Sequence, residues 1–175
     1  MPEGDTIFRT ARALGRALTD KQVTGFRSTI ALLTRYDDET PLVGQTVEQV
    51  ESRGKWLLIH FSGGGTLATH MLMSGSWHIY RPGERWQQPR INMRIVLENS
   101  EYIAVGFRVP VAKMLGPEQL AGAARIPAPT IDVLSEDFNA EDVARRLAAH
   151  KDEEIADVLL HQEVLAGVGN VFKSE

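Results

Sequence analysis

The stretch TVEQVESRGKWLLIHFSGGGTLATHM, residues 46–71, decides the fold class of this 175-residue chain. It holds strand-like runs at 46–52, 55–61 and 66–71, with Gly54 between the first two and a triple-glycine turn before the third. Short apolar and β-branched runs that alternate with glycine turns are typical of consecutive antiparallel strands. The stretch therefore predicts a strand pair that continues into a third strand.

Similar runs continue toward the C-terminus, so that the strand-like pattern extends from about residue 23 to residue 115. The further runs lie at 76–80, 93–97 and 102–106, and the turns between them are Ser74-Gly75, Pro82-Gly83 and Asn99-Ser100. Several short strands at this spacing predict an antiparallel sandwich or barrel.

Helical patterns flank this region on both sides. An apolar stripe predicts a helix over 7–18, with Asp5 or Thr6 as its N-cap. After a linker rich in proline and small residues at 122–129, Asn139 is a candidate cap for a helix over 140–149. A second helix is expected over 152–164, and after a glycine turn a third is expected to begin at 170 or 171.

The expected fold class is therefore α+β: an N-terminal helix plus an antiparallel β-sandwich or barrel, followed by a helical region. The expected division is an N-terminal domain over 1–122, a linker over 123–138 and the helical region over 139–175. The third helix reaches Glu175 after a turn and a half, so we expect that the chain stops inside an element, as a truncated gene product would.

Composition narrows the class of protein. The hydrophobic share of 43% and the charged share of 24% are those of a soluble globular protein, and no apolar run approaches the roughly 20 residues of a membrane span. Acids rather than bases near the N-terminus indicate no secretory signal, so the expected location is the cytoplasm. Without cysteine there is no disulfide framework and no thiolate metal site, and the five histidines show no metal-ligand spacing. A monomer is expected.

The net charge of −4 is unevenly distributed along the chain. Residues 126–175 hold 4 Lys/Arg against 11 Asp/Glu, a net −7, whereas residues 1–125 hold 15 against 12, a net +3. The mildly basic first part is compatible with a phosphate-binding face but does not require one.

The N-terminus and one strand start carry candidate catalytic groups. Removal of Met1 would leave Pro2 with a free secondary amine, which can form a Schiff base with an aldehyde, and Glu3 lies beside it in the sequence. Lys55, between Gly54 and the apolar run, can present an ammonium group to a phosphate. Alternatively, Pro2 is a common second residue without a role, and Lys55 is a solvated charge at a strand edge.

Two turns are candidates for nucleic-acid contact. The glycine turn LAGVGN at 165–170 can expose backbone N–H groups to an anion, with Asn170 as a further donor, or it can be a simple connection between helices. The apolar residues Leu72 and Met73 lie at the turn after the third strand. Methionine usually packs in a core, but an apolar tip on a turn can also wedge between bases.

In their order along the chain, PEGDT at 2–6, RGKW at 53–56 and LAGVGN at 165–170 resemble the Fpg/Nei family of DNA glycosylases. KMLGPEQL at 113–120 is similar to the bacterial endonuclease VIII-like branch of that family. The resemblance runs the full length of the chain, and the motifs together are highly specific.

The resemblance implies a bifunctional glycosylase and AP lyase of base excision repair. Pro2 would attack C1′ of the damaged nucleotide, and Glu3 would protonate the sugar ring oxygen so that the ring opens and the base departs. The iminium ion acidifies the C2′ proton, so that β-elimination breaks the strand and δ-elimination can follow. Lys55 would contact phosphate and donate a proton in β-elimination.

The resemblance also implies damaged double-stranded DNA as the partner. The base must be extruded, and Leu72 and Met73 occupy the turn that fills the void, with Met73 as the expected wedge. Asn170 matches the helix-two-turn-helix motif and would bind phosphates flanking the lesion; that motif is incomplete at Glu175. The DNA-contacting arginine of the family does not align cleanly, and Arg108 and Arg125 are both candidates.

This chain departs from the family pattern at its end. The family normally continues into further helices and a zinc finger or a zincless equivalent, so no cofactor or metal is expected here, and the structural zinc site would lie outside this chain. Because phosphate neutralisation dominates affinity, we expect weakened binding and activity on duplex DNA.

The branch implies oxidised pyrimidines, such as thymine glycol, as substrates in a cytoplasmic, nucleoid-associated bacterial enzyme. Alternatives are an 8-oxoguanine-directed Fpg-type glycosylase, although Gly4 and Asp5 replace the Leu-Pro usual there, and a non-catalytic module that binds damaged DNA. A β-sandwich interaction domain without a DNA role is a further alternative, for which the acidic C-terminal third is the best argument.

Overall fold

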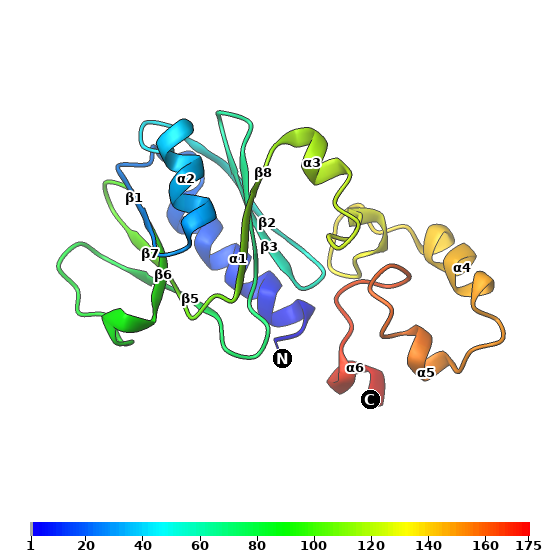
Figure 1. Cartoon of the computed structure of the whole chain (residues 1–175). Coiled ribbons are helices and arrows are strands. Elements are labelled where there is room, and N and C mark those ends of the chain that lie inside the picture. Colours follow the sequence, from blue (N-terminus) through cyan, green and yellow to red (C-terminus); the bar gives the residue numbers. More distant parts are fainter. Residues whose placement is uncertain (1) are drawn as a thin grey trace.

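The computed structural model describes residues 2–175; Met1, whose removal the sequence analysis expects, lies outside the described residues. Two antiparallel sheets and a long N-terminal helix form one side of the molecule, and short helical segments form the other (Figure 1). The N-terminal end of the long helix faces the last helical segment (Figure 1). The predicted α+β class, with a helix followed by a β-sandwich, is confirmed.

Each sheet has four strands. The first has the order β1-β6-β7-β5, with β1 at Gly25–Ser28, β6 at Met93–Glu98, β7 at Ile103–Phe107 and β5 at Ser76–Tyr80. The second has the order β2-β3-β4-β8, with β2 at Val47–Arg53, β3 at Trp56–Phe61, β4 at Thr66–His70 and β8 at Val111–Leu115. The stretch 46–71 thus forms three consecutive paired strands, as predicted.

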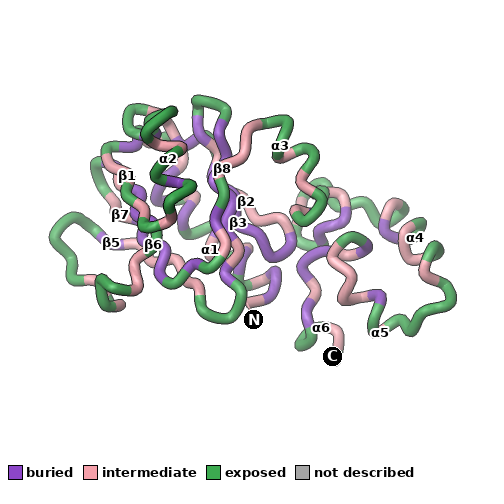
Figure 2. The backbone as a smooth tube through the Cα atoms, viewed as in Figure 1, coloured by how far each residue is buried: buried purple, intermediate pink, exposed green. Residues whose placement is uncertain are grey.

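Strand β3 is buried on both faces, which explains its unbroken apolar sequence. Successive strand residues point to opposite faces: Leu57 and Ile59 enter the main core, whereas Trp56 and Leu58 pack in a smaller cluster under the segment that follows β8. These strands form the buried centre of the molecule (Figure 2).

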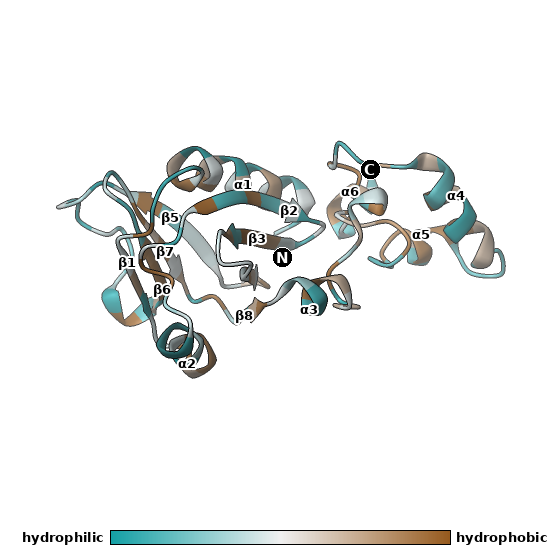
Figure 3. Ribbon diagram, turned by 90° about the horizontal axis from the view of Figure 1, so that it is seen from above, coloured by the Kyte–Doolittle hydropathy of each residue, from teal (hydrophilic) through white to brown (hydrophobic). Residues whose placement is uncertain are grey.

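Helix α1 (Gly4–Leu18) packs against β2 and β3 through its apolar stripe. Ile7, Leu14 and Leu18 are buried, while hydrophilic residues alternate with them along the helix (Figure 3). The helix begins earlier than predicted: its N-cap is Glu3, so neither Asp5 nor Thr6 caps it. The reason is tertiary, because the start of the helix is held by contacts with the far end of the chain.

The β2–β3 hairpin turns through two residues. Arg53 pairs with Trp56, which leaves Gly54 and Lys55 as the loop. Gly54 has φ +58, a left-handed conformation that glycine adopts without a steric penalty. The glycine therefore places Lys55 at the tip of a rigid hairpin.

The remaining helical elements follow the sheets. They are α2 (Ala31–Glu39), α3 (Pro117–Ala121), α4 (Ala140–Ala149), α5 (Ile155–Val158) and α6 (Asn170–Ser174), with single 3₁₀ turns at Arg90–Asn92 and Pro129–Ile131. The predicted cap of α4 is confirmed, because the Asn139 side chain accepts from the backbone N–H groups of Glu141 and Asp142, both at 3.0 Å. No helix among residues 2–175 is long and apolar enough to cross a membrane.

The helix predicted over 152–164 is wrong in extent. Only Ile155–Val158 is helical, and the chain then turns so that the Ala166 N–H reaches the carbonyl of Ile131 at 2.8 Å. The Gln162 side chain stabilises this turn: it accepts a hydrogen bond from Gly167 N–H at 3.1 Å and donates one to the Val168 carbonyl at 2.9 Å. Tertiary hydrogen bonds thus override the local helical preference.

Candidate functional site

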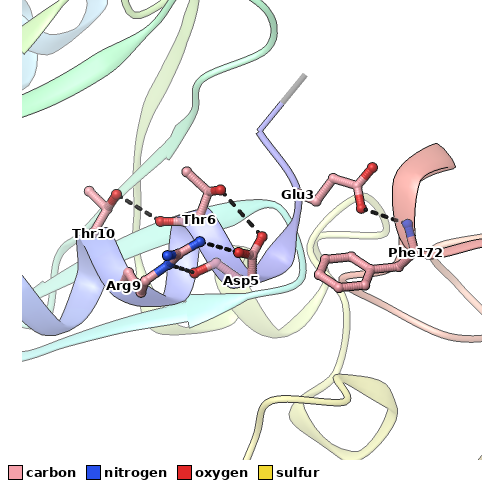
Figure 4. Close-up of polar contacts among 6 residues, drawn as sticks. All are labelled: Glu3, Asp5, Thr6, Arg9, Thr10 and Phe172. Atoms are coloured by element: carbon pink, nitrogen blue, oxygen red, sulfur yellow. Dashed lines mark hydrogen bonds and ion pairs between the residues drawn. The ribbon is translucent and has the colours of Figure 1, made fainter. Parts of the chain in front are cut away.

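The N-terminus is fastened to the glycine turn near the end of the chain. Gly4 N–H donates to the Gly167 carbonyl at 2.9 Å. Glu3 is only 9% exposed, and its carboxylate accepts from the backbone N–H groups of Val171 (2.9 Å) and Phe172 (3.4 Å), as Figure 4 shows for Phe172. Pro2, partly buried, immediately precedes these anchors, so its position is held by its neighbours.

The first turns of α1 are further braced by polar contacts along the helix (Figure 4). Arg9 forms an ion pair with Asp5, and the Thr10 hydroxyl donates to the Thr6 carbonyl at 2.8 Å. These contacts lie on the exposed side of the helix and leave Glu3 free to face α6.

Lys55, at the hairpin tip, is 8% exposed and lies within electrostatic reach of Glu3. Burial lowers the pKa of the Lys55 ammonium below its ordinary 10.5, and the Glu3 carboxylate opposes part of that shift. A lysine with a lowered pKa gives up its proton more readily near neutral pH. The structure therefore brings together two of the three predicted catalytic residues, directly beside the third.

His70, at the end of β4, joins the same neighbourhood. Its ring meets Trp56 edge-on with centroids 5.1 Å apart, and its Nδ1 accepts from Leu72 N–H at 3.2 Å. Burial lowers the pKa of His70, and the nearby Lys55 lowers it further. No feature of the sequence around His70 predicts a role for it in this site.

A cavity of about 340 Å³ opens beside these groups. Its walls include three basic side chains, Lys55, Lys113 and Arg125, together with Leu72 and Gln162. Residues of the β2–β3 hairpin, of the end of β4 and of the segment before the second 3₁₀ turn contribute to the lining of the cavity. Its basic lining suits an anion, and of the two candidate arginines it is Arg125 that lines it.

The turn after β4 presents apolar side chains to solvent. Leu72 is partly exposed and Met73 is 78% exposed, so neither packs in the core as methionine and leucine usually do. Ser74 Oγ donates to the Arg108 carbonyl at 3.4 Å, which places the second candidate arginine beside this turn. Leu72 (φ +46) and Arg108 (φ +49) both adopt left-handed backbone, a strained conformation that clusters at functional sites.

Asn170 begins α6 and is exposed, next to the residue whose N–H binds Glu3. The two glycines before it have different reasons: a Cβ on Gly169 would clash with the Glu3 side chain, and Gly167 has φ +92, a left-handed conformation. Gly4 is restricted by backbone, because a Cβ there would lie 2.7 Å from Gly167 Cα. The predicted glycine turn and the start of a helix at Asn170 are present.

Asp132 is a site-supporting residue that sequence reasoning missed. It is 2% exposed, and its two carboxylate oxygens accept from Gly54 N–H at 2.6 Å and Leu134 N–H at 3.0 Å. It therefore binds the hairpin that carries Lys55. No sequence signal separates it from the other acids of the acidic C-terminal third, since its partner lies 78 residues away.

The sequence pattern described as the formamidopyrimidine-DNA glycosylase N-terminal domain matches residues 1–108. The chain belongs to the Fpg/Nei family of DNA glycosylases. It is 37% identical to the probable endonuclease 8 2 of Streptomyces coelicolor over all of this chain and 62% of that protein. It is also 37% identical to the DNA-(apurinic or apyrimidinic site) lyase Nei2 of Mycolicibacterium smegmatis, over 65% of that protein.

The fold of this Fpg/Nei chain agrees with solved structures. The Lactococcus lactis formamidopyrimidine-DNA glycosylase, solved with AP-site DNA, superposes with a TM-score of 0.74 over 97% of this chain and 65% of that one, at 19% identity. The curated relatives fall in the predicted endonuclease VIII branch. The chain spans 62–66% of the length of these relatives.

Proposed function

We propose that this chain carries the catalytic centre of a bifunctional DNA glycosylase and AP lyase of base excision repair. The observation that supports it most is the meeting of the anchored Pro2-Glu3 start with the buried Lys55 beside a basic cavity. The N-terminal segment supplies Pro2 and Glu3, the distant β2–β3 hairpin supplies Lys55, and each of the three groups matches a chemical task in the reaction.

The reaction begins once Met1 has been removed. The Pro2 nitrogen forms a bond to C1′ of the damaged nucleotide, and the Glu3 carboxylic acid gives its proton to the ring oxygen as the C1′–O4′ bond breaks. The base departs with the bonding electrons of its glycosidic bond and takes up the proton that the Pro2 amine loses, which leaves an iminium ion between Pro2 and C1′. Because Glu3 is held by two backbone N–H groups, its distance from Pro2 is set before the substrate arrives.

Strand cleavage follows from the iminium ion. Loss of the C2′ proton supplies the electrons that expel the 3′ phosphate, and δ-elimination of the 5′ phosphate can follow. The ammonium of Lys55, with its pKa lowered by burial, supplies a proton and a positive charge where the negative charge develops.

We propose damaged double-stranded DNA as the partner of this site. Met73, with Leu72, enters the space left by the extruded nucleotide, since both are exposed on a turn beside the cavity. Arg125, Arg108 and Asn170 contact phosphates around the lesion. The Lactococcus glycosylase of the same fold was solved with AP-site DNA, which supports this partner.

We propose oxidised pyrimidines as the lesion class, in a monomeric, cytoplasmic, nucleoid-associated protein. Relatives named endonuclease 8 favour this class over the 8-oxoguanine-directed alternative. Single-turnover excision of thymine glycol and of 8-oxoguanine from otherwise identical duplexes compares the two directly.

Borohydride trapping on an abasic oligonucleotide tests the proposed function. The method detects the Schiff base directly, so a positive result does not require the enzyme to complete strand cleavage. The chain with Met1 removed should form a covalent complex, whereas Pro2→Gly and a form with an N-terminal extension should not. Trapping that persists in both forms would refute Pro2 as the nucleophile, and DNA binding without any trapping would favour the non-catalytic module.

A further inference from the structure

Two histidines and a glutamate meet in the helical part of the molecule, far along the chain from the N-terminal site. His150 ends α4, Glu153 lies in the following loop and His161 lies just after α5. One donor atom from each residue lies within 4.8 Å of the others. His150 Nδ1 is 2.6 Å from one Glu153 oxygen, and His161 Nε2 is 4.0 Å from the other.

We infer that His150, Glu153 and His161 form a binding site for a divalent transition metal of the Zn²⁺ class. Two imidazole nitrogens and one carboxylate oxygen are a donor set that zinc accepts, with water in the remaining position. Calcium and magnesium prefer all-oxygen sites, so the two imidazoles disfavour them.

The geometry needs only side-chain adjustment. At bond lengths of about 2.0–2.1 Å, the donor atoms around a tetrahedral zinc ion lie about 3.3 Å apart. This distance falls between the 2.6 Å from Glu153 to His150 and the 4.0 Å from Glu153 to His161. The two imidazoles are already packed edge-on with centroids 5.3 Å apart. His161 Nδ1 has no hydrogen-bond partner among the described residues, so no competing hydrogen bond at that nitrogen holds the ring.

The surroundings also suit a cation. All three side chains are partly accessible, so that an ion and its water can enter. Asp152 and Asp157 lie within a few residues of the three side chains in the sequence and add negative charge there.

A metal here would brace the segment that leads to the glycine turn. His161 directly precedes Gln162, whose side chain holds Gly167 and Val168. The histidine spacing in the sequence carries no metal signal, because residues 150 and 161 meet only when the chain turns after α5. The proposed site differs from the expectation of a metal-free chain, and it stands independently of the proposed function.

Titration of Zn²⁺ into the chelator-treated whole chain, followed by calorimetry, tests the site. The expected result is one saturable ion per chain, with Kd raised at least about tenfold in Glu153→Gln and in His161→Gln, since even partners of metal ligands contribute about 10–100-fold. Glu154→Gln is the matched control, because this neighbouring exposed acid forms no side-chain cap of α5. It should bind as the parent does.

Two further measurements keep the result interpretable if a variant is less stable. Circular dichroism in the absence of metal reports whether each variant is folded, and His150→Gln provides a third independent ligand removal. Zn²⁺ should raise the melting temperature of the parent and of Glu154→Gln, but not that of the ligand variants. No stoichiometric binding, or binding unchanged in all folded ligand variants, would overturn the site.

Discussion

The Glu3 carboxylate accepts a hydrogen bond from the backbone N–H of Val171 at 2.9 Å, across 168 residues of sequence. The residue adjacent to the proposed nucleophile is therefore positioned by the last helix of the chain. Any change at this contact should affect both the anchoring of α6 and the proton supply in the proposed reaction.

Replacing Glu3 by glutamine should separate base excision from Schiff-base formation. The amide can still accept from Val171, but it has no proton for the ring oxygen, so excision should fall by about 10²–10⁴-fold, the usual contribution of a general acid. A pre-formed abasic site already offers an aldehyde, so borohydride trapping there should persist. Asp5→Asn, in the same helical turn, is the control and should excise normally; unchanged excision by Glu3→Gln would exclude the acid role.

Replacing Gly169 by alanine should destabilise the fold by displacing the buried Glu3 side chain from its hydrogen bonds with Val171 and Phe172. The φ of Gly169 is −128, which any residue adopts, but the new Cβ would lie 2.4 Å from Glu3 Cδ. We expect a loss of about 1–3 kcal/mol in the free energy of unfolding in urea, as for other overpacked sites. Gly122→Ala, whose nearest contact would be 3.5 Å away, should change it by less than about 0.5 kcal/mol. Equal losses of unfolding free energy in Gly169→Ala and Gly122→Ala would show that the close approach of Gly169 to Glu3 does not matter for stability.

Replacing Lys55 by methionine should raise the pKa of His70, because a positive neighbour that disfavours protonation is removed. NMR titration of the His70 ring measures this, with Lys113→Met as the control that retains Lys55.

The folded-state pKa of His70 lies below its unfolded value of 6.5, so the unfolded chain binds more protons between the two values. The free energy of unfolding therefore decreases as the pH falls through that window. This decrease should be smaller in Lys55→Met, because its His70 pKa lies closer to the unfolded value. An unchanged His70 titration would contradict the coupling.

Replacing Asp132 by asparagine should weaken the hold on the catalytic hairpin. Both carboxylate oxygens accept N–H groups, from Gly54 and Leu134, and the NH₂ of asparagine would face one of them as a second donor. A buried unsatisfied group costs about 1–3 kcal/mol, which urea unfolding measures. The exposed Asp137→Asn should be neutral. A stable Asp132→Asn variant would show that the hairpin is held by other contacts.

Replacing Met73 by alanine should affect DNA binding and not stability. Met73 is 78% exposed, so the free energy of unfolding should change by less than about 0.5 kcal/mol. Binding to a duplex with an abasic analogue should weaken by up to about 1.5–3 kcal/mol, the value of burying a methionine side chain. Fluorescence anisotropy measures it, and Ile91→Ala, at 90% exposed, is the matched control. Equal losses in both variants would argue against a specific wedge.

Local pattern was sufficient for much of the fold. The three strands in residues 46–71, the helix α1 and the cap at Asn139 follow from alternation, helical spacing and capping chemistry, which act between near neighbours. The strands β1 and β8 and the helices α2 and α3 were missed, because short elements with few periodic positions carry little local signal.

The sequence by itself determined the β-sandwich with its leading helix and singled out Pro2, Glu3, Lys55 and Asn170, because glycine turns, apolar runs and ordered motifs are local properties. Only the tertiary structure decided that Glu3 binds α6, that Asp132 holds the hairpin of Lys55, and that His150 and His161 meet. These contacts join residues that are separated in the sequence. Backbone donors such as Val171 N–H carry no residue signature, so the folded chain alone reveals where their hydrogen bonds go.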